Sequence, residues 1–204
     1  MKIIGFTGRA GCGKDTAVKA LQLKYTDFFT RETPYHYSFA GPLRRGLAAM
    51  LGGEIEMQSH DPVRKNEVVE AYGVSPRTML QTLGTEWGRN LINDDIWIIR
   101  AKQIWSETND INPNAIILIS DCRFDNEAQA ILDMGGCVIE LVRPNNPHTT
   151  GINAGGVANH SSEAGVDPKL ISYTITNHFG LITDFESRIV NDQFITSHLK
   201  GTTS

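Results

Sequence analysis

One segment near the N-terminus limits what this chain can fold into more than any other. Residues 8–14 read Gly-Arg-Ala-Gly-Cys-Gly-Lys and fit the first seven positions of the phosphate-binding loop pattern. The apolar run Lys2–Thr7 before them is typical of a buried strand, and residues 15–25 carry apolar side chains at helical intervals. Because a strand, a glycine-rich loop and a helix follow one another in the order that the pattern needs, the segment predicts a site for the phosphates of a nucleotide.

Each part of this loop has a physical reason to bind phosphate. The backbone N–H groups of Gly11, Cys12 and Gly13 can point at phosphate oxygens, since glycine places no Cβ in the way. The N-terminus of the following helix adds partial positive charge, and Lys14 is expected to bridge toward the β- and γ-phosphates. The alternative interpretation is a glycine-rich turn between a strand and a helix that binds nothing.

The loop departs from the pattern at its eighth position. Asp15 stands where a Ser or Thr usually contacts a magnesium ion, and a hydroxyl follows one residue late at Thr16. Asp15 and Thr16 are therefore both candidate magnesium ligands, and Asp15 is also a candidate for contact with the phosphoryl acceptor. Alternatively, Asp15 is an acidic residue of the first helical turn that the helix dipole favours.

Strand and helix signals alternate along the rest of the chain. They predict one domain over residues 1–204, with a three-layer α/β fold and a five-stranded parallel sheet. Further strands are expected at residues 36–40, 115–120, Cys137–Val142 and Tyr173–Thr176. Helices are expected at residues 42–51, 76–90, 96–105, 123–134 and 181–190, with a cap at Ser75 and another at Asp94-Asp95.

Three segments between these elements have compositions of their own. The polar stretch 52–75 is expected to hold only a short helix between residues 63 and 72, and residues after 190 read as a polar tail. Residues 41–107 as a whole predict a helical block. Residues 143–160, rich in glycine, proline and asparagine and without periodicity, predict a mobile lid.

Composition and charge exclude several classes of protein. A net charge of -4 and a pI near 5.8 argue against a large basic face, so stable binding of nucleic acid is not expected. The longest apolar runs are far shorter than the roughly 18 residues that a membrane span needs. Three well-separated cysteines predict neither a zinc cluster nor a disulfide framework, so a cytoplasmic location is expected. The sequence leaves both a monomer and a homodimer open.

Charged residues after the strands are candidates for the reaction site. Asp121 and Arg123 follow the strand at 115–120, where a carboxylate can lie near the metal and an arginine can face the transferred phosphate. Arg143 follows another strand and could close over the phosphates with the lid. The alternatives are that Asp121 caps the helix near Arg123 and that each arginine is a solvated surface residue. The arginines considered are Arg44, Arg77, Arg89, Arg123 and Arg143.

The three tryptophans are better explained by packing than by chemistry. Trp87, Trp97 and Trp105 lie at helical spacing among aliphatic residues, so we expect them in the core. One of them could alternatively line a pocket that stacks on a base. His160 begins a segment that resembles a helix capping box, and a cap is favoured over a catalytic base there, because a phosphate monoester acceptor is already deprotonated.

Taken together, these motifs resemble the deoxynucleoside monophosphate kinases of tailed bacteriophages. The resemblance covers nearly the whole chain, and the order and spacing of the motifs are more specific than any one of them. The segments are Gly-Lys-Asp-Thr at 13–16, Phe-Ala-Gly-Pro-Leu-Arg at 39–44, Arg-Thr-Met-Leu-Gln-Thr-Leu-Gly-Thr at 77–85, Asp-Ile-Trp at 95–97, Asp-Cys-Arg at 121–123, Val-Arg-Pro at 142–144, His-Ser-Ser-Glu at 160–163 and Thr-Ile-Thr-Asn at 174–177.

The resemblance implies a phosphate-loop kinase fold, ATP with Mg²⁺, and a deoxynucleoside monophosphate bound between the loop and the helical block. It implies that Arg44, Arg77 and Gln81 border the acceptor, together with Asp121 and Arg123. It also implies that Arg123 and Arg143 serve the phosphates beside Lys14 and Asp15, that Asp121 joins Asp15 and Thr16 near the metal, and that Thr176 and Asn177 border the adenine. The chain lacks a long insertion that a T-even phage relative has before the Arg77 helix, and Arg64 and Lys65 stand in the polar stretch left there.

Two other functions remain open on the sequence. The first is a kinase for another small metabolite, such as dephospho-coenzyme A, whose alcohol acceptor would need a general base, with Asp15 as the nearest candidate. The second, from a different class, is a DNA-associated or switch-type NTPase that hydrolyses nucleotide without an acceptor. Against the second, the chain has no guanine-selecting Asn-Lys-x-Asp run and no basic tract.

Overall fold

A parallel sheet forms the centre of the protein. The computed structural model describes residues 1–27, 34–61, 63–144, 161, 164–178 and 181–200. Five strands pair in the order β2-β3-β1-β4-β5, and every pairing is parallel. Their bounds are Lys2–Thr7 (β1), Tyr35–Tyr37 (β2), Ile116–Ile119 (β3), Cys137–Val142 (β4) and Tyr173–Thr176 (β5).

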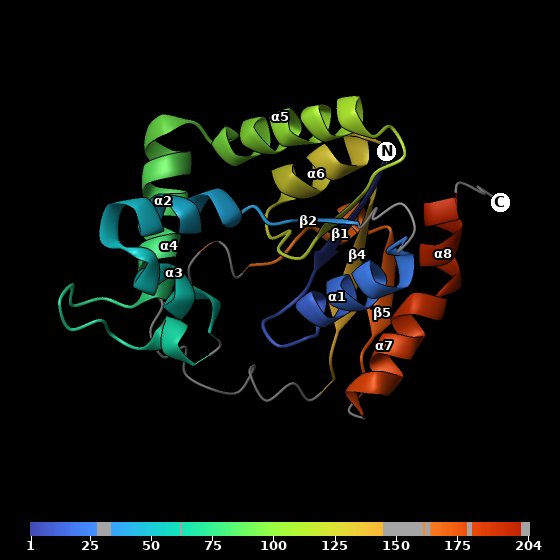
Figure 1. Cartoon of the computed structure of the whole chain (residues 1–204), viewed down its shortest axis with the longest axis horizontal. Helices are drawn as coiled ribbons and strands as arrows, with labels where there is room; N and C mark the ends of the chain where they lie inside the picture. The colour runs from blue at the N-terminus through green and yellow to red at the C-terminus, as the bar shows by residue number, and fades with distance from the viewer. Residues whose placement is uncertain (28–33, 62, 145–160, 162–163, 179–180, 201–204) are drawn as a thin grey trace.

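Helices cover both faces of this sheet (Figure 1). One face packs against α1 (Lys14–Tyr25), α7 (Ile182–Asn191) and α8 (Gln193–Lys200), and the other against α5 (Ile96–Ile111) and α6 (Asp125–Asp133). Neighbouring residues of β1 point to opposite faces, so Ile3 joins the core under α5 and α6 while Ile4 joins the core under α1. The three-layer α/β fold with a five-stranded parallel sheet is therefore confirmed.

The helical block stands beside the sheet, where β2 ends (Figure 1). Its elements are α2 (Gly41–Leu51), α3 (Gly53–His60), a 3-10 turn (Arg64–Asn66), α4 (Pro76–Gln81) and a π-helix (Thr82–Ile92). Leu47, Ile55 and Met79 form a small core of its own. The expected start signal at Ser75 is confirmed, because the Ser75 side chain accepts from the backbone N–H of Thr78 at 3.2 Å.

Several element predictions were wrong, and for α3 and α8 the reason is burial against other elements, which the local pattern does not show. Of the short helix expected between residues 63 and 72, only the 3-10 turn Arg64–Asn66 forms among these described residues, and the unexpected α3 precedes it and buries Ile55 and Ser59. The expected polar tail contains α8, whose Ile195 is fully buried against the sheet. Helix α5 also runs on to Ile111, beyond the expected end.

The remaining sequence predictions on the fold have mixed outcomes. The strand expected at 36–40 ends at Tyr37, and the helix expected over 76–90 changes to π-helical geometry at Thr82. Asp95 is the N-cap residue of α5, although its side chain does not cap the helix. Residues 145–160, most of the expected lid, and most of the His160 segment lie outside the described residues, and a single domain over 1–204 stays a prediction. None of the described helices is long and apolar enough to cross a membrane.

Candidate functional site

The glycine-rich loop lies at the middle of the carboxyl edge of the sheet. It connects β1, the central strand, to α1, and the neighbouring strands β3 and β4 end on either side of it. Gly8 and Gly13 have positive φ angles of 125° and 107°. A Cβ at Gly8 would lie 2.4 Å from the carbonyl oxygen of Leu141, and one at Gly13 would lie 2.9 Å from the ring of Phe185. Both positions therefore require glycine.

The ammonium group of Lys14 hydrogen-bonds backbone carbonyl oxygens of the loop. Its Nζ atom donates to the carbonyl oxygens of Gly8 at 2.6 Å and Arg9 at 2.9 Å, and lies 3.6 Å from Sγ of Cys12. Burial raises the pKa of the Cys12 thiol, and the Lys14 charge offsets only part of that rise. Cys12 therefore stays a neutral packing residue, while Lys14 is the charged group of the loop.

Two side chains from the ends of β4 and β5 brace this loop. Arg143 Nη1 donates to the carbonyl oxygen of Gly11 at 3.0 Å, and Asn177 Nδ2 donates to that of Cys12 at 3.0 Å. Thr176 lies beside them at the end of β5 and accepts from Arg188 through its carbonyl oxygen. The structure thus brings Arg143 and Asn177 to the loop, while the roles that the resemblance implies for them stay predictions.

Asp121 connects the end of β3 to the start of the helical block. Its carboxylate accepts from Oγ of Ser38 at 2.7 Å and from the backbone N–H groups of Phe39 at 2.9 Å and Ala40 at 3.0 Å. These bonds turn the chain after β2 and lead it into α2. The alternative that Asp121 caps its own following helix was wrong, since that helix begins after Phe124 and is capped by Glu127.

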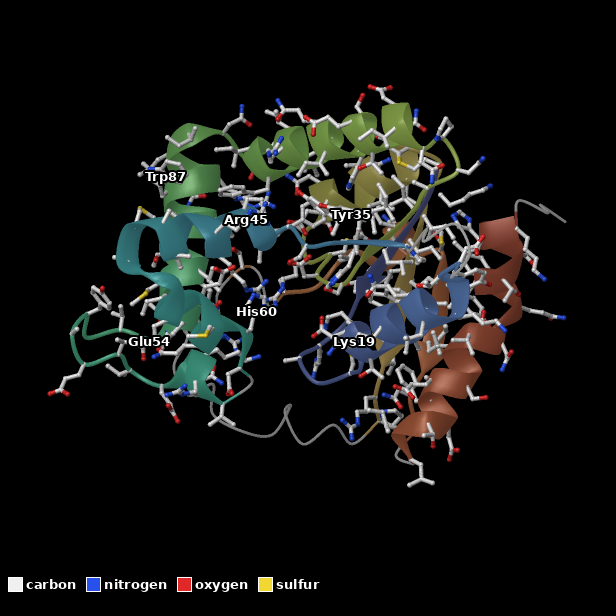
Figure 2. All side chains as sticks on the ribbon, in the orientation of Figure 1. Lys19, Tyr35, Arg45, Glu54, His60 and Trp87 are labelled. Atoms are coloured by element: carbon white, nitrogen blue, oxygen red, sulfur yellow. The ribbon has the colours of Figure 1, made fainter. Side chains whose placement is uncertain are left out.

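Cationic side chains from several elements share one electrostatic environment beside the loop. Partial burial lowers the pKa of Lys65, and the charges of Arg77, Arg123 and Arg44 lower it further. The pKa of His60 is likewise lowered, first by desolvation and then by the Arg44 charge. Figure 2 shows His60 on the side of the helical block that faces α1. We call Arg44, Lys65, Arg77 and Arg123 the cation cluster; His60 lies in the same environment as a neutral side chain, since its pKa is lowered.

Asp15 is the acidic neighbour that this cluster shares with the loop. It lies on the exposed side of the first turn of α1. Its negative charge opposes part of the lowering of the pKa of both Lys65 and His60. Thr16, the next residue, is half-buried. Because like charges repel at short range, a group of cations with one carboxylate suits a ligand that brings negative charge of its own.

Hydrogen bonds hold the cluster residues of the helical block in place. Asp61 accepts from the backbone N–H groups of Val63 and Arg64 and so shapes the turn that carries Lys65. Arg77 Nη1 donates to Oδ1 of Asn66 at 3.4 Å. Arg44 Nη1 lies 3.5 Å from Oγ of Ser38, and its buried Nε has no hydrogen-bond partner within the part of the chain that the structure describes.

Not every sequence candidate lies in this site. Arg89 is buried and pairs with Glu127 at 2.7 Å, so neither a phosphate contact nor a solvated surface position describes it. Trp105 is a core residue as expected, whereas Trp87 is exposed (Figure 2). Gln81 is buried at the end of α4. Sequence reasoning missed His60, Ser38 and Glu127 and gave Lys65 no role, because only the fold brings them to these positions.

The loop, its place on the sheet and the cations beside it define a phosphate-loop nucleotide-binding protein of the α/β class. The chain belongs to the deoxynucleotide monophosphate kinase family, whose sequence model matches residues 52–189. That match begins after the phosphate loop, so the family and the loop are two independent observations. The family resemblance expected from the motifs is thereby confirmed.

Individual relatives agree with this family. The deoxynucleoside-5'-monophosphate kinase of Escherichia phage T5 is 25% identical, over 93% of this chain and 94% of the phage protein. A protein of Acanthamoeba polyphaga mimivirus, provisionally named a deoxynucleotide monophosphate kinase, is 29% identical over 71% of this chain and 75% of its own. Among solved structures, the Mycobacterium tuberculosis APS kinase CysC in complex with AMPPNP and APS aligns over 93% and 95% of the two chains with a TM-score of 0.42 and 15% identity, a likeness too weak to carry an argument.

Proposed function

We propose that this chain transfers the γ-phosphoryl group of ATP to the 5′-phosphate of a deoxynucleoside monophosphate. The observation that carries the proposal is the cation cluster beside the phosphate loop. A loop that binds one set of phosphates and a separate group of cations next to it supply two phosphate sites, one for the donor and one for the acceptor. Family membership supports the nature of the acceptor.

The donor set of the site fits magnesium that arrives with ATP. No group of three or more His, Cys, Asp or Glu residues that could hold a metal occurs among the described residues. Mg²⁺ is usually bound through one or two carboxylates together with substrate phosphates and water. Asp15 and Thr16, with Asp121 at the end of β3, would supply its protein ligands. When bound, the ion neutralises charge on the β- and γ-phosphates.

The protein groups act by position and charge. Lys14 exchanges the carbonyl oxygens of Gly8 and Arg9 for phosphate oxygens, while the N–H groups of residues 11–16 surround the phosphates. Arg123 and Arg143 stabilise charge on the transferred group. The acceptor needs no general base, because its phosphate oxygen is already ionised.

The remaining contacts fix the two nucleotides. Arg44, Lys65 and Arg77 hold the acceptor phosphate, since guanidinium and ammonium groups match phosphate oxygens in charge and geometry. Gln81 borders the acceptor at the end of α4. Thr176, the last residue of β5, and Asn177, which follows it beside the loop, border the adenine of ATP.

A panel of acceptors tests the proposal. Purified protein is incubated with ATP, Mg²⁺ and each deoxynucleoside or ribonucleoside monophosphate, and diphosphate formation is measured. We expect turnover with one or more deoxynucleoside monophosphates. ATP hydrolysis that no monophosphate stimulates, or transfer only to a different class of acceptor, would refute the assignment.

Replacement of Lys14, compared with a control lysine on the same helix, tests the role of the loop. Lys14→Ala should lower kcat by about 100-fold or more, because it removes the positive charge that stabilises the negative charge on the transferred phosphoryl group. Lys19→Ala, an exposed lysine on the same helix (Figure 2), should leave kcat unchanged. Circular dichroism and the thermal midpoint show whether both variants keep the fold. Equal kcat values in the two variants would show that Lys14 has no role in the reaction.

A further inference from the structure

A buried ion pair joins the helical block to the core of the protein. Arg89, near the end of the π-helix, places Nη2 2.7 Å from Oε1 of Glu127 in the first turn of α6, and both side chains are 4% exposed. Removing one partner of such a pair leaves an uncompensated buried charge, so the contact resists separation of the two elements.

The second carboxylate oxygen of Glu127 holds the backbone of Arg123. Oε2 accepts from the N–H of Arg123 at 2.8 Å and from that of Phe124 at 3.2 Å. Both N–H groups belong to the segment between β3 and α6, two and three residues after Asp121. One carboxylate therefore binds Arg89 on one side and the backbone of a cation-cluster residue on the other.

The guanidinium of Arg89 is fixed by its other contacts as well. Nη1 donates to the carbonyl oxygen of Asp94 at 2.8 Å and lies 3.3 Å from Oδ1 of Asn126. Its Cζ atom stands 4.1 Å from the centre of the Phe124 ring. This planar fork contacts the block and α6 together, whereas a lysine would keep the charge without the fork geometry.

We propose that Glu127 and Arg89 are positioning residues that set the place of Arg123 relative to the acceptor cations of the helical block. Phosphoryl transfer between two bound nucleotides requires the cation at the transferred group to be held in register with the acceptor site. The carboxylate supplies that register, because it connects the Arg123 backbone to the block through Arg89. The inference rests on the proposed function and on the role given there to Arg123.

The test uses variants that change the hydrogen bonds with little change in volume. In Glu127→Gln, the amide must place its NH₂ group against either Arg89 or the backbone N–H groups, so one contact is lost. Arg89→Lys keeps the charge and loses the fork. We expect kcat for both variants to fall about 10-fold or more, with the dissociation constant for MgATP within about twofold of the parent protein. Ile195→Val in α8, far from the pair in sequence, serves as a control for lost stability alone.

A double-variant cycle separates positioning from general destabilisation. If Glu127 acts through Arg123, adding Glu127→Gln to Arg123→Ala should cause no further loss of kcat. The inference would be overturned if the losses of kcat in the two single variants multiply in the double variant, or if kcat is unchanged in Glu127→Gln or in Arg123→Ala. It would also be overturned if the loss of kcat in Glu127→Gln equals that of Ile195→Val at the same thermal midpoint. If Glu127→Gln does not fold, Arg89→Lys is judged by the same cycle. Absence of transfer by the parent protein would instead refute the proposed function.

Discussion

Asp15 shows how one residue can look like a defect in a motif and yet agree with its surroundings. The pattern predicts a hydroxyl at this position, and the chain places it at Thr16 instead. In the structure Asp15 is exposed on the first turn of α1, and its charge acts on His60 and Lys65 of the helical block. Asp15 therefore acts electrostatically on residues of the helical block, although it belongs to the first turn of α1.

Glu127 gives a pH prediction at the same scale. Burial raises the pKa of its carboxyl to about 7, against the opposing effects of the Arg123 N–H and the Arg89 charge, and the Asp121 charge adds to the rise. Between the ordinary value of 4.5 and 7, the folded state binds more protons than the unfolded state. The free energy of unfolding should therefore fall as pH rises through this window, by about 1.4 kcal/mol for each pKa unit of difference.

Denaturant titrations between pH 4.5 and 7.5 measure this dependence. The matched protein is Glu127→Gln, which has no proton to exchange at this position and should show a flatter profile. Carboxyl groups remote from Glu127 contribute equally to both proteins, so the difference between the two profiles reports Glu127 together with its coupling to Asp121. Parallel profiles would contradict the assigned shift.

At the scale of elements, the π-helical geometry of Thr82–Ile92 is the feature of the block that the sequence did not predict. Ser75 and Pro76 predicted the start of the helix correctly, but the pattern carries no sign of a change to wider turns at Thr82. The π-helix packs against Trp97 of α5, a contact that the local pattern does not predict. Trp97 Nε1 donates to the carbonyl oxygen of Gly84 at 2.8 Å, which fixes the indole against the helix.

Gly88 makes this packing testable. A Cβ at Gly88 would lie 2.6 Å from the Trp97 ring, so Gly88→Ala should displace the indole and lower the free energy of unfolding by about 1–3 kcal/mol. Gly46→Ala in α2 is the control, because a Cβ there meets nothing within 4 Å and alanine should stabilise the helix by about 0.5–1 kcal/mol. Urea unfolding monitored by tryptophan fluorescence measures both. A stabilising Gly88→Ala would contradict the packing described.

At the scale of the whole molecule, the sequence predicted the sheet well and the acceptor site poorly. Strands such as β3 are continuous apolar runs that local pattern identifies, and the glycine loop carries its chemistry in consecutive residues. The cation cluster combines Arg44, Lys65 and Arg123 from separate elements, and only the fold relates their positions. Helix α8 was missed for the same reason, since the burial of Ile195 depends on the sheet it covers.

Two separate phosphate sites should respond separately to ligands, which tests the arrangement of the molecule as a whole. A ligand at 100 times its dissociation constant stabilises a folded protein by about 2.7 kcal/mol. MgATP and a deoxynucleoside monophosphate, added one at a time, should each raise the thermal midpoint of the parent protein. Lys65→Met should keep the response to MgATP and weaken acceptor binding by about 10- to 100-fold, the effect of losing one charged hydrogen bond.

Arg64→Met is the matched control for this experiment, because Arg64 is the exposed neighbour of Lys65 on the same 3-10 turn. It should respond to both ligands as the parent does. Lys14→Ala should show the opposite pattern to Lys65→Met, with a reduced response to MgATP and an unchanged response to the monophosphate. If either replacement weakens both responses equally, donor and acceptor phosphates share one site. A Lys65→Met protein that matches Arg64→Met would remove Lys65 from acceptor binding while leaving the loop in place.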